Sequence, residues 1–187
     1  MRREDWIRLL EHHGEPNPAP LPPDPTLLRG SRGEQILWRA CAGEPLDPTA
    51  GITGAAGALL AVDAYLAIEV WAECELAAVH ALSRIVRERR ASRPSGAGAD
   101  APADRLGTRL VEAVRWHLEH TQPDNSTNRP WAIHAFLLGD DGSGEASLYA
   151  ETLLHNTLAT DARREPLSRW ILADAARELR QASVDPA

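Results

Sequence analysis

The sequence predicts an all-α protein: a compact helical bundle built from a long central helix and two helical hairpins, with a proline-rich N-terminal arm. Apolar residues recur at helical spacing in several segments, which is the pattern of amphipathic helices. No segment sustains the alternation of apolar and polar residues that marks a strand. Prolines are concentrated in connections or stand at helix starts, where the missing N–H costs little.

The N-terminal part is predicted to contain two short helices joined by an extended segment. Residues 2–12 and 32–42 have helical patterns, whereas residues 15–25 contain six prolines, which exclude a helix interior. We therefore expect residues 1–53 to form short helices and a proline-rich arm that pack on a helical core domain of residues 54–187.

One long helix is predicted from Ala58 to Arg90, because alanine, leucine and glutamate are abundant and no proline interrupts them. It is apolar on nearly every side, which is typical of a central, buried helix. Glycine occurs at every third position from Gly51 to Gly57 just before it, but this segment matches no phosphate-binding motif, so close packing is the better interpretation. Residues 91–104 are small and include prolines, and we expect a flexible linker there.

The second half is predicted to form the two hairpins. Helices are expected over residues 105–121, 130–138, 145–159 and 166–182, separated by polar or glycine-rich loops. Pro130 and Pro166 are each expected in the first turn of a helix.

Composition argues against several function classes. The net charge of −7 gives no electrostatic footprint for nucleic acid. The longest apolar run, residues 54–82, contains four acidic residues, which makes a membrane span costly. The two cysteines form no metal or disulfide pattern, and with no secretory signal evident a cytoplasmic location is expected.

Acidic side chains and histidines stand on faces that are otherwise apolar. At about 100° per residue, Glu69, Glu73 and His80 lie within a sector of about 40° on the central helix. The same reasoning directs four further side chains toward the interior: His117, His134, Glu151 and His155. Helical bundles build metal sites from inward-facing carboxylates and histidines, so these seven residues are the predicted metal ligands, with a divalent ion as candidate cofactor. The spacing departs from the Glu-x-x-His pattern, and HExxH is absent. The alternative is that each residue is a hydrogen-bonded or ion-paired core residue with a structural role.

The polar loop at residues 122–129 is a second candidate site, because it precedes a helix whose free N–H groups attract anions or carbonyl oxygens. Its predicted ligand-binding residues are Asp124, Asn125, Asn128, Arg129 and the adjacent Trp131. The alternative is a turn that caps the helix. The other tryptophans are expected to fill the core.

Three functions remain open at this stage. The favoured one is a module that binds a small polar molecule or a protein partner through a polar pocket lined by inward-facing Glu and His. The alternative is an enzyme that uses the same residues for metal-dependent or acid-base chemistry on a small molecule. The third is a scaffold in which the buried charges are only paired.

Overall fold

Helices are the main secondary structure of the described part of the chain. In this computed structural model that part comprises residues 1–17, 31–55, 57–62, 67–92, 102–123, 127–140 and 142–184. Within these ranges the chain forms α-helices and short 3-10 helices and no strand, which confirms the all-α prediction. The elements are α1 (Arg3–His13), α2 (Arg32–Cys41), η2 (Pro48–Gly51), α3 (Ile68–Ala91), α4 (Pro102–His120), α5 (Ile133–Leu138), α6 (Glu145–Ala159), η4 (Asp161–Arg164) and α7 (Pro166–Val184).

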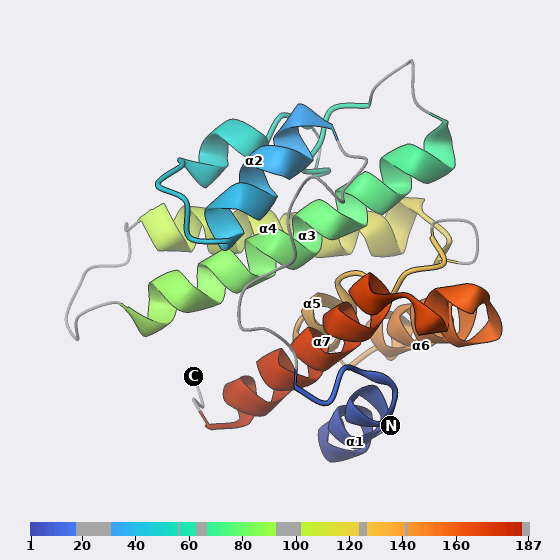
Figure 1. The fold of residues 1–187 in the computed structure, drawn as a ribbon. Helices are drawn as coiled ribbons and strands as arrows, with labels where there is room; N and C mark the ends of the chain where they lie inside the picture. Colours follow the sequence, from blue (N-terminus) through green and yellow to red (C-terminus); the bar gives the residue numbers. More distant parts are fainter. Residues whose placement is uncertain are drawn as a thin grey trace.

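The helices form two groups (Figure 1). In the first group α3 runs diagonally across the molecule and packs against α2 and α4. In the second group α5, α6 and α7 lie together, and α1 packs on α7. The short helix α5 contacts α3, α6 and α7, so it joins the two groups. Side chains of α3, α5 and α7 therefore meet in the middle of the protein.

The central helix is shorter than predicted, because it begins at Ile68 and not at Ala58. The residues before it fold back onto it: the backbone N–H groups of Leu59 and Leu60 donate to the two carboxylate oxygens of Glu75, over 2.5 and 2.7 Å. N–H groups in the first turn of a helix have no internal partner, and here the buried carboxylate accepts from both of them. Local sequence periodicity does not reveal such a distant acceptor.

Two predicted connections fall largely outside the described residues. These are the proline-rich segment, described only up to residue 17, and the linker, of which residues 93–101 are not described. The described ends of the linker are helical, since α3 continues to Ala91 and α4 already begins at Pro102. Proline is accepted at that position because the first N–H of a helix has no internal partner.

Tryptophan fills the core, as predicted. Five of the six tryptophan side chains are buried, and Trp116 is half-buried. The ring of Trp38 makes edge contacts with Trp131 and Trp170, at centroid distances of 5.3 and 6.1 Å. Aromatic pairs in this geometry stabilise a core beyond the area that they bury.

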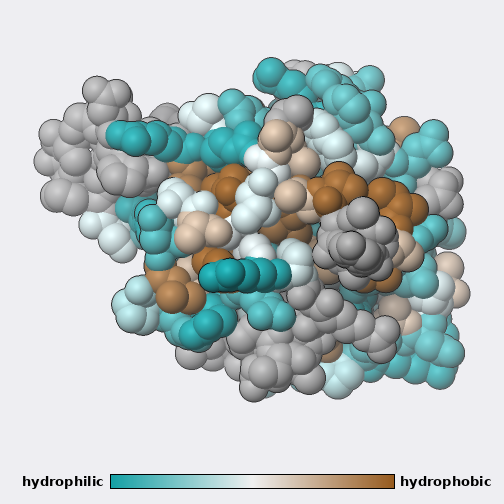
Figure 2. Space-filling view, turned by 90° about the horizontal axis from the view of Figure 1, so that it is seen from above, coloured by the Kyte–Doolittle hydropathy of each residue, from teal (hydrophilic) through white to brown (hydrophobic). Residues whose placement is uncertain are grey.

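Some hydrophobic side chains reach the surface instead. Figure 2 shows hydrophobic residues gathered on the side where α3 begins, and Val62, Ile68 and Val70 are exposed near that helix end. Among the described helices, none is both long enough and apolar enough to cross a membrane.

Candidate functional site

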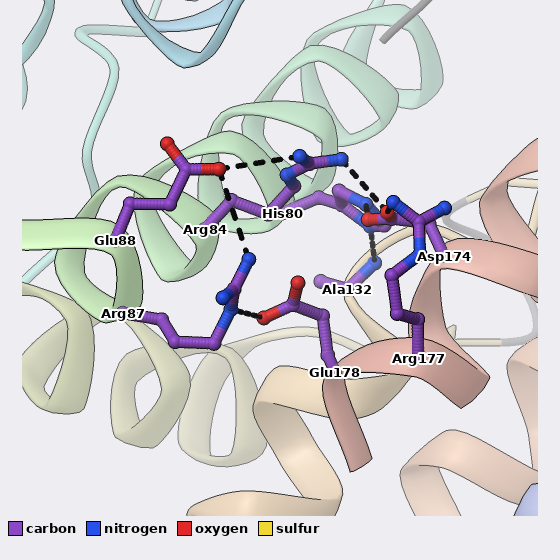
Figure 3. Close-up of polar contacts among 8 residues, drawn as sticks. All are labelled: His80, Arg84, Arg87, Glu88, Ala132, Asp174, Arg177 and Glu178. Carbon is purple, nitrogen blue, oxygen red and sulfur yellow. Dashed lines mark hydrogen bonds and ion pairs between the residues drawn. The ribbon is translucent and has the colours of Figure 1, made fainter. Parts of the chain in front are cut away.

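A buried cluster of charged and polar side chains lies where α3 and α7 meet (Figure 3). His80 on α3 contacts Asp174 on α7, with 3.0 Å between Nε2 and Oδ2. Arg84, one turn after His80, donates from Nη1 to the other oxygen of Asp174 over 2.7 Å. All three residues are buried. Asp174 is therefore the shared acceptor at the centre of the cluster.

The residue just before α5 contacts the other nitrogen of His80. The N–H of Ala132 donates to Nδ1 of His80 over 3.2 Å, so Nδ1 is an acceptor and the imidazole proton is on Nε2, facing Asp174. Ala132 has φ 56°, a left-handed conformation that costs a non-glycine residue about 1 kcal/mol. Both imidazole nitrogens are engaged, which leaves neither free for a metal ion or a substrate proton.

The charge of Asp174 is held inside the core by its neighbours. Burial by itself raises the pKa of this carboxyl, but the hydrogen bond of His80 and the positive charge of Arg84 outweigh burial and lower the pKa to about 2. Arg177 adds a contact of 3.3 Å. Asp174 is thus a fully compensated anion, which is the behaviour of a structural ion pair.

His134 on α5 stands next to this cluster without joining it. Its ring lies edge-on to that of His80, with 4.5 Å between centroids. Neither of its nitrogens has a hydrogen-bond partner among the described residues. Burial holds its pKa well below the ordinary value. His134 is therefore a neutral core residue at physiological pH.

The cluster continues along α3 and α7 toward the surface. Arg87 donates from Nε to Oε2 of Glu178, and its Nη2 lies 3.7 Å from Oε1 of Glu88. The Glu178 side chain is 1% exposed, and its Oε1 has no hydrogen-bond partner among the described residues. Burial raises the pKa of Glu178, although Arg87 opposes that effect. In this ion pair, Oε2 of Glu178 accepts from Arg87, and Oε1 of Glu178 accepts no hydrogen bond from the described residues.

A second buried acid lies at the other end of α3. Glu75 accepts hydrogen bonds from the backbone of Leu59 and Leu60. Its Oε1 is 3.9 Å from Nε2 of His117 on α4. Burial raises the pKa of Glu75 to about 7, although the two backbone donors oppose this. Burial lowers the pKa of His117 to about 3. The acid and the base are therefore both pushed toward their neutral forms.

Three predicted inward-facing residues are on the surface. Glu69, Glu151 and His155 are exposed, so their predicted orientation is wrong. Helix α6 is apolar on several sides, and it buries the face of Ala150 and Leu153 and not that of Leu148, which is 64% exposed. The angular position of a polar residue locates the core only where one face is clearly more polar than the other. In α6 the packing partners decide instead.

The remaining predicted metal ligands are buried or half-buried but separate. His80 and His134 meet at α5, His117 lies beside Glu75, and Glu73 is half-buried near the polar loop. Within the described ranges no three His, Cys, Asp or Glu side chains form a group that could hold a metal ion. The structure does not bring the seven residues into one chamber.

The polar loop is described only in part, because Asp124 and Asn125 lie outside the described residues. Asn128 is exposed, and Trp131 is fully buried in the aromatic core. Arg129 donates to Glu73 over 2.6 Å and to Glu165 over 3.2 Å. Two residues predicted for different sites, Glu73 and Arg129, thus form one ion pair that ties the loop to α3.

A cleft opens between the ends of the helices, away from all of these predicted residues. Its volume is about 960 Å³. Its walls are formed by α3, α4, α5, α6 and α7 together with residues 139 and 143. The apolar lining includes Val86, Leu110, Val111, Val114, Leu118, Leu138 and Ala146, and the polar lining includes Ser83, Arg87, Arg90, Arg115, Glu119, Ser143, Glu145, Glu178 and Gln181. Through Arg87 and Glu178 the cleft adjoins the buried cluster.

The sequence interpretation missed the buried acids that organise these sites. The omitted residues are Glu34, Glu75, Asp174 and Glu178, each at most 2% exposed. A signal existed for Asp174, which is the only polar residue in the segment from Ile171 to Ala176. No comparable signal marks Glu178, because it lies in a polar stretch in which Arg177 precedes it and Arg180 follows two residues later.

Comparisons with known proteins give no further guide to function. Searches of protein-family models, of curated proteins and of solved structures each find no match to this chain.

Proposed function

We propose that this protein is a helical ligand-binding module that takes a small, mainly apolar organic molecule into the cleft between α3, α4, α5, α6 and α7. The observation that carries the proposal is the cleft itself. Its volume of about 960 Å³ falls at the upper end of the range of about 300 to 1,000 Å³ that is usual for small-molecule sites.

The lining supports a ligand with an apolar body. Val86, Leu110, Val114 and Leu118 line the cleft from α3 and α4, and polar or charged side chains line the rest of it. Val111 and Leu138 also line it and are 56% and 38% exposed. Apolar surface of this kind is costly in water and gains free energy when a ligand covers it. A pocket that combines an apolar wall with polar groups that fix the ligand's orientation is the usual form of a small-molecule site.

Catalysis by the buried cluster has no comparable support. His80 and Asp174 have the composition of a general-base pair, but hydrogen bonds to Ala132 and Asp174 use both imidazole nitrogens. A general base needs a free nitrogen within reach of the proton that it abstracts. We therefore assign the cluster to holding α3, α5 and α7 together beneath the cleft.

The proposal is tested with Nile red, a neutral apolar dye whose fluorescence rises in an apolar site. We expect saturable binding of one dye per chain. Val111→Trp places a bulky ring in the cleft. It should lower the affinity for the dye by about tenfold or more, and tenfold is equivalent to about 1.4 kcal/mol.

The matched control is Val70→Trp, because Val70 is an exposed helical valine, 39% accessible, that does not line the cleft. Surface substitutions of this kind usually change free energies by no more than about 0.5 kcal/mol, so dye affinity should stay within about twofold. The absence of saturable binding, or an equal loss in both variants, would refute the proposal.

A further inference from the structure

The wall of the cleft formed by α7 carries two hydrogen-bond acceptors without donors. Oε1 of Glu178 and Oε1 of Gln181 are both buried and have no hydrogen-bond partner among the described residues. Both residues line the cleft. A buried acceptor without a donor costs about 1 to 3 kcal/mol. This part of the wall therefore gains free energy from any ligand that brings donors to it.

The two acceptors come from neighbouring positions on α7. Positions 178 and 181 are three residues apart in α7, and side chains at that spacing are neighbours on a helix surface, with Cβ atoms about 5 to 6 Å apart. A primary ammonium group carries three donors and no acceptor. A carboxylate carries only acceptors and would add to the mismatch.

The charges around Glu178 are balanced within the cluster. Arg87 bonds one oxygen of Glu178, and Glu88 contacts both Arg87 and Arg84. Asp174, one turn earlier on α7, is paired with Arg84 and Arg177. The other arginines of the cleft, Arg90 and Arg115, are exposed, so solvent screens them.

We propose that the cleft selects ligands with a primary amine on an apolar body, with the amine bound between Glu178 and Gln181. This inference rests on the proposed function and names the class of ligand that the cleft takes. It assigns the ligand's head group to α7 and its apolar part to the wall formed by α3 and α4.

The experiment compares three probes with the same chain length: octylamine, octanoate and 1-octanol. Each is titrated against the complex of the protein with Nile red, and the concentration that displaces half of the dye is measured. Octylamine should be effective at a concentration about tenfold or more below that of the other two. Equal potency of the three probes would overturn the inference.

Two variants locate the preference. Glu178→Gln and Gln181→Leu should each reduce the advantage of octylamine to about threefold or less, which corresponds to losing one charge-assisted hydrogen bond. Gln181→Leu is the safer variant, since it leaves the pair of Arg87 and Glu178 intact. Gln35→Leu, an exposed position on α2 outside the cleft, is the matched control and should retain the full advantage.

The outcomes separate this inference from the proposed function. Failure of Nile red to bind, or a Val111→Trp variant that binds it normally, counts against a ligand site in the cleft altogether. Binding of the dye without a preference for octylamine, or a preference that survives both α7 variants, rejects only the amine.

Discussion

At the scale of single residues, buried charge in this protein is compensated by partners from other helices. Asp174 accepts hydrogen bonds from His80 and Arg84, and the N–H of Ala132 occupies the second nitrogen of His80. Removing one member of such a cluster leaves the others buried and unpaired, which is costlier than never having buried them. Asp174 is the member on which the others depend.

Asp174→Asn should lower the free energy of unfolding by about 3 to 5 kcal/mol, because the amide introduces donors where Arg84 and His80 also donate. Urea denaturation followed by circular dichroism measures this loss. Glu88→Gln is the control at the rim of the same cluster, where the carboxylate is 46% exposed. It should cost less than about 1 kcal/mol. An equal loss of unfolding free energy in the two variants would show that burial does not determine how much these contacts stabilise the protein.

At the scale of elements, the close approach of α2 to η2 requires glycine. A Cβ added at Gly33 in α2 would lie 2.6 Å from the carbonyl oxygen of Gly51 in η2 and 2.8 Å from a methyl group of Leu60. This backbone contact agrees with the sequence interpretation that the glycines of residues 51–57 allow close packing. The contact places α2 on α3 beside the segment that Glu75 holds.

Gly33→Ala should lower the free energy of unfolding by about 1 to 3 kcal/mol, because backbone atoms have to move to admit the methyl group. Gly107→Ala in α4 is the matched control. There the added Cβ would come too close only to the end of the Arg90 side chain, at 2.6 Å, which can rotate away, and it would make an ordinary contact with Val86 at 3.8 Å. That change should be neutral or stabilise the helix by up to about 1 kcal/mol. Thermal unfolding of both variants checks the pair, and a stable Gly33→Ala protein would contradict the packing argument.

At the scale of the whole molecule, the buried acids and histidines set opposite pH dependences of stability. The pKa of Glu75 is raised to about 7, so its contribution to stability is complete below its ordinary value of 4.5 and is lost as the pH rises through 7. The pKa of His117 is lowered to about 3, so its contribution is complete above 6.5 and is lost as the pH falls through 3. Between pH 4.5 and 6.5, a rise in pH lowers the contribution of Glu75 to stability and raises that of His117. The two effects partly cancel, so the free energy of unfolding changes less with pH than either group alone would make it change.

Glu75→Gln removes one side of this balance. The difference in unfolding free energy between the parent and the variant should grow by about 3 kcal/mol as the pH falls from 7 to 4.5, because the parent gains a proton on folding and the variant does not. Urea titrations at a series of pH values measure it. Glu151→Gln, which removes an exposed carboxylate, is the control for the loss of one acidic side chain. A constant difference for Glu75→Gln would show that this acid is ionised throughout the range.

The local pattern predicted the helices well and the candidate site poorly. The bounds of α6 agree with the prediction to the residue, because Gly144 and Thr160 flank an uninterrupted helical pattern. His80, His117 and His134 are buried as their helical positions indicated. The position of a residue around its helix indicates only which way its side chain points, however. It does not indicate which side chain of another helix will contact it. The partners of these histidines are up to 94 residues away in the sequence.

The sequence by itself determined that this chain is all-α, where most of its helices begin and end, and that tryptophan fills its core, because these follow from interactions within a few residues. Only the tertiary structure decided where α3 begins, which acids are buried and where the cleft opens. Each of these depends on a contact between distant elements: Glu75 with Leu59, Asp174 with His80, and α3 with α4. The free energy of such contacts depends on geometry that the sequence does not display, and the proposed ligand site is formed by that geometry.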